Sequence, residues 1–196
     1  MSRMLASLSL LVAVPALAQT APMRHVRGTV QSLAGSTLTI EAPDGQSTAV
    51  KLAPNWSVTG VRPITLDAIK PGSYIGAVAV GPASHQTATE VHVLPEAARG
   101  AGEGQSPWDM PQATMTNGTV EAEATSTSGR VLTMSLKGKT VEMTVPENVP
   151  IVTFVPGSQS LVVPGAKVFI SASVGADGAL TASRVQVGEQ GIAPPL

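Results

Sequence analysis

The chain has 196 residues, of which 43% are hydrophobic, 13% charged and 3% aromatic, and its formal net charge is -1 at pH 7. A chain of this length and hydrophobicity can bury a core, which excludes extensive disorder, and its balanced charge provides no general attraction to nucleic acid or anionic lipid. The sequence contains no cysteine, which excludes disulfides, thiolate metal sites and cysteine nucleophiles.

The first 18 residues have the pattern of a secretory signal peptide. Arg3 provides a positive start, residues 4–14 are largely apolar, and Ala16-Leu17-Ala18 is a small-x-small cleavage site. The apolar run is shorter than the roughly 20 residues that a membrane-spanning helix needs. We therefore expect residues 1–18 to be removed, and the mature protein to be periplasmic or secreted and to have no membrane span.

The rest of the sequence contains two copies of one pattern. Gly28-Thr29-Val30 returns as Gly118-Thr119-Val120, and Leu38-Thr39-Ile40 returns as Leu132-Thr133-Met134. These and similar matches keep the same order and lie about 90 residues apart, which is typical of an internal duplication. We expect one β domain at 25–95, a second at 116–188, a linker at 96–115 and a C-terminal tail at 189–196.

The apolar and polar residues of the first copy alternate as they do in strands. We expect strands at 25–33, 36–42, 47–52, 56–61, 73–81 and 87–94, and one helical turn at 66–69 with Thr65 as its cap. In the last strand, His92 alternates with Val91 and Val93 and is expected to face solvent. Asp44-Gly45, Lys137-Gly138 and Asp177-Gly178 are expected to form the tight turns.

Several short strands within about 70 residues predict an all-β protein. The specific expectation is two tandem small OB-like five-stranded barrels with a connecting irregular segment. A barrel hides the sheet edges that would otherwise promote aggregation. A domain of this size buries only about 60% of its unfolded surface, so we expect the two barrels to pack on each other or on the linker.

Residues 96–115, here called the strap, interrupt the repeat and hold the candidate binding residues Arg99, Glu103, Trp108 and Asp109. Trp108 offers a large contact area and an indole donor. Arg99 with the acidic residues could recognise a polar ligand. The alternative is a structural linker in which Trp108 packs between the barrels and Arg99 forms an internal ion pair.

Metal-binding and catalytic patterns are weak. Met23, His25, Met110 and Met115 supply thioether and imidazole groups that suit copper(I), but their spacing is loose. The nucleophile elbow, the zinc-protease motif and the phosphate-binding loop do not occur in the sequence. We therefore predict no catalytic residue, no enzyme activity and no cofactor. A nucleic-acid partner is not expected either, because there is no basic stripe with stacking aromatic residues.

Arg27-Gly28-Thr29-Val30, Asp44-Gly45-Gln46, residues 69–76 and the run from Leu94 to Asp109 resemble an uncharacterised family of exported bacterial proteins built from small OB-like β domains. The resemblance covers residues 25–116 well and the second copy less closely. Some members carry automatically assigned names that link them to metal transport, even to a transporter permease. A permease needs several membrane-spanning helices, which the mature sequence lacks. The resemblance implies the fold and export, and it implies no activity.

Together these patterns predict a non-catalytic binding or interaction module of the bacterial cell envelope. Its partner would be an envelope protein or a small ligand. One alternative is a soluble periplasmic metal-handling protein that assists transport. A second alternative is an envelope enzyme that uses a carboxylate or a serine of the strap.

Overall fold

The computed structural model describes residues 22–127 and 129–195, so the expected signal peptide at 1–18 lies outside the described residues. The described chain is all-β, with twelve strands and three short 3-10 helices. Their bounds are β1 (Met23–Ala34), β2 (Thr37–Glu41), β3 (Ser47–Pro63), η1 (Leu66–Ala68), β4 (Tyr74–Val80), β5 (His85–Val93), η2 (Glu96–Ala98), β6 (Gly104–Pro107), β7 (Ala113–Ser126), β8 (Gly129–Leu136), β9 (Lys139–Val145), β10 (Ile151–Gly157), η3 (Gln159–Leu161), β11 (Lys167–Val174) and β12 (Leu180–Gly188).

Local patterns located the strands well. The main difference is that the strands expected at 47–52 and 56–61 form one continuous strand, β3. The helical turn at Leu66–Ala68 is present and Thr65 occupies its N-cap position as expected, but the Thr65 side chain makes no capping hydrogen bond. Lys137 and Gly138, with φ of 49° and 78°, join β8 to β9, and this two-residue turn with two positive φ angles is the type that hairpins prefer.

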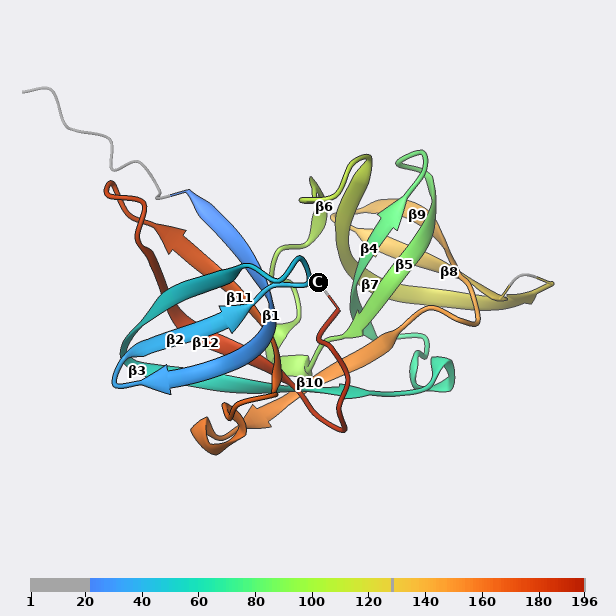
Figure 1. Cartoon of the computed structure of the whole chain (residues 1–196). Coiled ribbons are helices and arrows are strands. Elements are labelled where there is room, and N and C mark those ends of the chain that lie inside the picture. The colour runs from blue at the N-terminus through green and yellow to red at the C-terminus, as the bar shows by residue number, and fades with distance from the viewer. Residues whose placement is uncertain (1–21, 128, 196) are drawn as a thin grey trace, which may run out of the picture.

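Five strands close into a mixed barrel, shown on the left of Figure 1. The antiparallel order β12-β11-β1-β2-β3 is closed by a parallel pairing of β12 with β3, which runs from Thr181 opposite Lys51 to Gly188 opposite Val61. The barrel thus uses strands from both ends of the described chain. Closure leaves none of these five strands as a free edge over its paired length.

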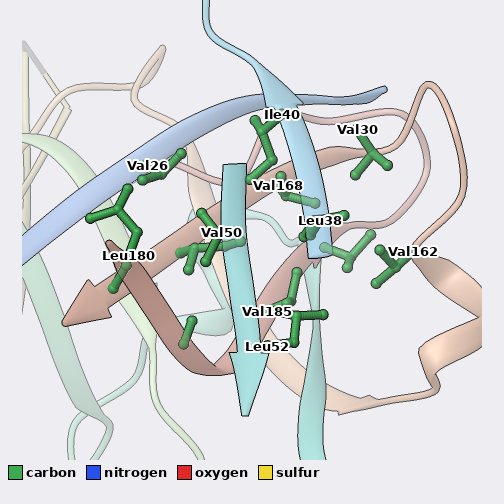
Figure 2. Close-up of a cluster of buried hydrophobic side chains, with 14 of the residues drawn as sticks. Val26, Val30, Leu38, Ile40, Val50, Leu52, Val162, Val168, Leu180 and Val185 are labelled. Atoms are coloured by element: carbon green, nitrogen blue, oxygen red, sulfur yellow. The ribbon is translucent and has the colours of Figure 1, made fainter. Parts of the chain in front are cut away.

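The barrel interior is filled by aliphatic side chains (Figure 2). Leu38, Ile40 and Val50 have no exposed surface, and Val185 of the last strand packs into the same cluster. Burial of each such side chain stabilises the fold by about 1.5–3 kcal/mol. In a chain without cysteine, this burial is the main source of stability.

Seven further strands continue the same sheet. β10 pairs antiparallel with β3 and parallel with β5, and the order then runs β5-β4-β7-β8-β9. β9 also pairs with β5 over three residues, and β6 lies beside β7. A second buried cluster, which includes Ile75, Leu132 and Met134, packs among these strands. We call β4, β5, β7, β8 and β9 the central strand group, because they come from the middle of the chain.

The two repeats exchange strands. The closed barrel contains β1, β2 and β3 of the first repeat together with β11 and β12 of the second. The central strand group contains β4 and β5 of the first repeat together with β7, β8 and β9 of the second. The structure therefore differs from the tandem arrangement expected from the sequence. The chain passes between the two groups along β3 and β10, which run side by side (Figure 1).

The repeated Gly-Thr-Val motif has a steric explanation. A Cβ atom at Gly28 would lie 2.1 Å from the carbonyl oxygen of Glu41, and one at Gly118 would lie 2.6 Å from that of Ser135. In both copies the first strand therefore approaches the second more closely than any side chain permits. The repeat thus retains glycine where two strands come into close contact.

The strand exchange can be tested by cutting the full chain. We expect a protease site inserted between the exposed residues Gly100 and Ala101 to give fragments that remain together in size-exclusion chromatography. The reason is that β4 and β5 stay paired with β7 and β9 after the cut. The fragments should separate only in urea, together with loss of the β-sheet circular dichroism signal. Fragments that separate in native buffer would show that each repeat closes on itself.

Candidate binding surface

The strap is more regular than the irregular segment expected from the sequence. It begins with η2 and contains β6, which pairs antiparallel with β7 from Gly104 opposite Asn117 to Pro107 opposite Thr114. β8 pairs with β7 only from Thr119 onward. β6 therefore covers the first half of β7, which β8 leaves uncovered, and this pairing fixes the position of the whole strap.

Arg99 anchors the start of the strap to the central strand group. Its guanidinium binds the Glu96 carboxylate, with Nη2 2.7 Å from Oε2, and this contact lowers the pKa of Glu96. It also donates to the carbonyl oxygen of Gly72 at 2.8 Å and to the hydroxyl of Thr119 at 3.2 Å. The same group lies 5.8 Å from the centre of the Tyr74 ring. Its donors thus serve contacts within the protein.

Glu103 connects the strap to the β8–β9 hairpin. Its Oε1 accepts a hydrogen bond of 2.7 Å from the backbone N–H of Lys137. Lys137 is the first residue of the two-residue turn, where the backbone N–H has no partner within the hairpin. The carboxylate therefore holds the tip of the hairpin next to β6.

Trp108 and Asp109 attach the other end of the strap to the closed barrel. Asp109 accepts hydrogen bonds from Arg27 Nη1 and Nη2 at 2.8 and 3.2 Å, and its Oδ2 lies 2.9 Å from His25 Nδ1. The ring centre of Trp108 lies 4.7 Å from that of His25, which in turn lies 5.2 Å from Phe169. We call these five residues the clasp. They come from β1, β11 and the strap.

The charge of Asp109 depends on the clasp. Hydrogen bonds from Arg27, supported by His25, hold the pKa of the Asp109 carboxyl below its usual value, although partial burial acts in the opposite direction. Asp109 is therefore ionised at neutral pH. Arg27 also lies 5.0 Å from the centre of the Phe169 ring, so its guanidinium contacts both an anion and an aromatic face.

The four candidate binding residues occupy three places. Arg99 contacts the central strand group, Glu103 contacts the hairpin turn, and Trp108 and Asp109 belong to the clasp. Each of the three charged groups forms hydrogen bonds inside the protein. These internal contacts match the alternative interpretation, in which the strap is a structural linker.

The candidate metal-binding residues are partly brought together. Met23 and His25 alternate along β1 and share one face of that strand. Met110 follows Asp109 directly, and both methionines are well exposed, at 57% and 44%. Met115 lies on β7, paired with Ser106 of β6. Among the described residues there is no group of three or more His, Cys, Asp or Glu side chains that could hold a metal ion.

His92 is buried, with 2% of its surface exposed, so its expected exposure to solvent is wrong. Its Nε2 lies 3.3 Å from Oε1 of Glu90 on the same strand, and its ring lies 5.6 Å from Phe154 of β10. One face of β5 packs in the central cluster and β10 lies beside the strand. Val91 does belong to the core cluster, but alternation could not show that the neighbouring His92 is covered as well.

A groove that sequence reasoning missed lies between the strap and the β8–β9 hairpin. It measures about 560 Å³. Glu103 to Ser106 form one wall, and Lys137 and Lys139 stand on the other. Leu136 and Val141 at its base are 4% and 5% exposed. In the sequence, the feature that could have indicated this groove is the pair of lysines that flank Gly138.

The clasp gives a test of both stability and pH dependence. We expect Asp109→Asn to lower the free energy of unfolding by about 1 kcal/mol at pH 7, because a charged bidentate contact that is partly exposed is lost. Since the pKa of Asp109 is lowered in the folded state, its contribution is complete above about pH 4 and disappears as the pH falls through the folded value. Urea unfolding at several pH values measures this difference. Glu96→Gln, at an exposed ion pair, should have a smaller effect, and equal effects of the two variants would contradict the role of the clasp.

Comparison with models of protein families, with curated proteins and with solved structures found no match for this chain. Within residues 22–127 and 129–195, the structure contains no helix that is long and apolar enough to cross a membrane. The assignment of function therefore depends on the groove, the strap and the clasp.

Proposed function

We propose that the protein is an exported, non-catalytic interaction module that binds an acidic segment of a cell-envelope protein in the groove between β6 and the β8–β9 hairpin. The observation that carries this proposal is the pair of lysines on one wall of the groove, which outnumber the single carboxylate, Glu103, in its lining. Lys137 and Lys139 stand on one wall, and neither takes part in an ion pair among the described residues.

The shape of the groove supports an extended ligand. One wall is a strand of four residues, and the floor includes the apolar side chains of Leu136 and Val141. A peptide could place its carboxylates near the lysines and its aliphatic groups on the floor. Pro107 gives β6 no N–H at that position, which limits strand addition to this edge. Recognition by charge and shape therefore fits the groove better than extension of the sheet.

A non-catalytic role is supported by the contacts of the strap carboxylates. Glu96 binds Arg99, Glu103 accepts from Lys137, and Asp109 binds Arg27. A general acid or base needs to reach a substrate proton. Carboxylates that already fix the position of the strap are poorly placed for that task.

The proposal also includes export of the protein and a second small barrel. Residues 1–18 support export by their signal-peptide pattern. The short parallel pairing of β9 with β5 supports a second small OB-like barrel built from the central strand group. The resemblance to an exported bacterial family supports the same interpretation.

Charge reversal in the groove tests the function. We expect a fluorescent peptide rich in glutamate to bind the wild-type protein in a salt-dependent manner, and Lys137→Glu combined with Lys139→Glu to weaken binding by at least about tenfold. The reason is that attraction is replaced by repulsion at both positions. Fluorescence anisotropy at low and physiological salt measures the affinity.

Lys51→Glu combined with Arg24→Glu is the control matched in charge, because both side chains are exposed on strands of the closed barrel. It changes the net charge without touching the groove and should leave the affinity nearly unchanged. Equal losses in the control and the groove variant would show that only overall charge matters. Absence of peptide binding by the wild-type protein would refute this proposal.

A further inference from the structure

The clasp leaves one ring nitrogen of His25 suited to a metal ion. The Oδ2 atom of Asp109 already accepts a hydrogen bond from Arg27 Nη1 at 2.8 Å, so His25 Nδ1, which lies 2.9 Å from the same oxygen, is assigned as a second donor. In the neutral imidazole the proton then sits on Nδ1 and the lone pair on Nε2. A histidine whose other ring nitrogen donates to a carboxylate is the usual arrangement of a metal ligand.

Two exposed methionines adjoin the residues of this contact in the sequence, Met23 on the His25 side and Met110 on the Asp109 side. Met23 is two residues before His25 on the same face of β1, and its sulfur accepts a hydrogen bond from the Ser173 hydroxyl at 3.5 Å. Met110 follows Asp109, which itself contacts His25. Each methionine thus places a soft thioether ligand within two residues of a side chain of the His25–Asp109 contact.

We propose that Met23, His25 and Met110 form a surface site for copper(I), with thioether sulfur from the two methionines and Nε2 from the histidine. Thioether and imidazole ligands favour copper(I) over hard cations such as Mg²⁺ and Ca²⁺. Asp109 acts as a positioning residue, because it fixes the histidine tautomer, and Trp108 forms an apolar wall beside the imidazole. This site is separate from the groove and does not depend on the proposed peptide binding.

Met115 is not included in the site. It lies on β7 between Val78 of β4 and Ser106 of β6, and neither of these strand partners belongs to the clasp. Met23 and Met110, by contrast, lie at the start of a strand and in the turn between β6 and β7, where Ala113 N–H donates to the Met110 carbonyl oxygen. Their side chains can therefore adjust to a metal ion.

The test is a copper(I) titration of the full mature chain without oxygen, in competition with a chromophoric copper(I) chelator. We expect binding of one ion per chain. Trp108 fluorescence should be quenched, because its ring lies 4.7 Å from His25, and a Trp56→Phe background isolates this signal. Zinc, which gains little from thioether ligands, should bind much more weakly than copper(I).

Conservative variants separate the ligands from the fold. Met23→Leu and Met110→Leu should each lower the copper(I) affinity about tenfold or more and leave the thermal midpoint nearly unchanged, because leucine keeps the volume of methionine. Met134→Leu, in the buried central cluster, is the matched control and should retain full affinity. His25→Ala should abolish quenching, and Asp109→Asn should weaken binding about tenfold or more by changing the partner of Nδ1.

The outcomes distinguish this site from adventitious binding. Wild-type affinity in the Met23→Leu, Met110→Leu double variant would overturn the proposal, even if copper(I) binds elsewhere on the protein. Equal affinity for zinc and copper(I) would also overturn it, because it would mean that the thioethers are not ligands. Failure of the wild-type chain to compete with the chelator at all would do the same. None of these results bears on peptide binding in the groove.

Discussion

The parallel pairing of β12 with β3 is the interaction on which the rest of the structure depends. It closes the barrel by joining the last strand of the chain to the third, over a register that extends from Lys51 to Val61. Closure in turn places β11 beside β1, so that Phe169 lies opposite Arg27. Without Phe169, the guanidinium of Arg27 would lose the aromatic ring that it contacts, and the His25 ring would keep only Trp108 as an aromatic neighbour.

Strand exchange between the repeats follows from their similarity. Both copies present the same alternation and the same close glycine contact, at Gly28 and Gly118. A strand of one copy can therefore satisfy the pairing and burial needs of the other. The long strand β3 pairs with β2 at its start and with β10 near its end, so it carries the chain from the closed barrel toward the central strand group. Loop closure over long sequence separations costs little additional entropy, so the distant pairing is accessible.

The similarity of the two copies explains why the sequence predicts the strands but not which strands pair with one another. Period-two alternation determines which residues face a core, and tight-turn residues such as Lys137 and Gly138 mark where hairpins bend. Both are local properties, and the structure confirms them. The choice of partner strand is not local, because two nearly equivalent copies offer the same hydrogen-bond donors and apolar faces. The expected strands were therefore largely correct, although the arrangement of the repeats differs.

At the candidate site too, the sequence indicates individual residues but not their distant partners. Trp108 and Asp109 stood out because they are unusual residues in a segment that interrupts the repeat. Their partners Arg27 and Phe169 did not, because each lies in an ordinary strand far away in the sequence. Burial of His92 was missed for a related reason, since the Phe154 ring beside it belongs to β10, a strand outside the β4–β5 hairpin.

The strap places the two proposed sites at opposite ends of one short strand. Glu103 precedes β6 and holds the hairpin beside the groove, whereas Asp109 follows β6 and holds the clasp. Four residues of β6 paired with β7 lie between them, and this pairing does not involve either carboxylate. A ligand changes a distant site only if it favours one of two arrangements of the intervening element. Because β6 is held by its backbone pairing with β7, we expect no coupling between the proposed groove and the proposed copper(I) site.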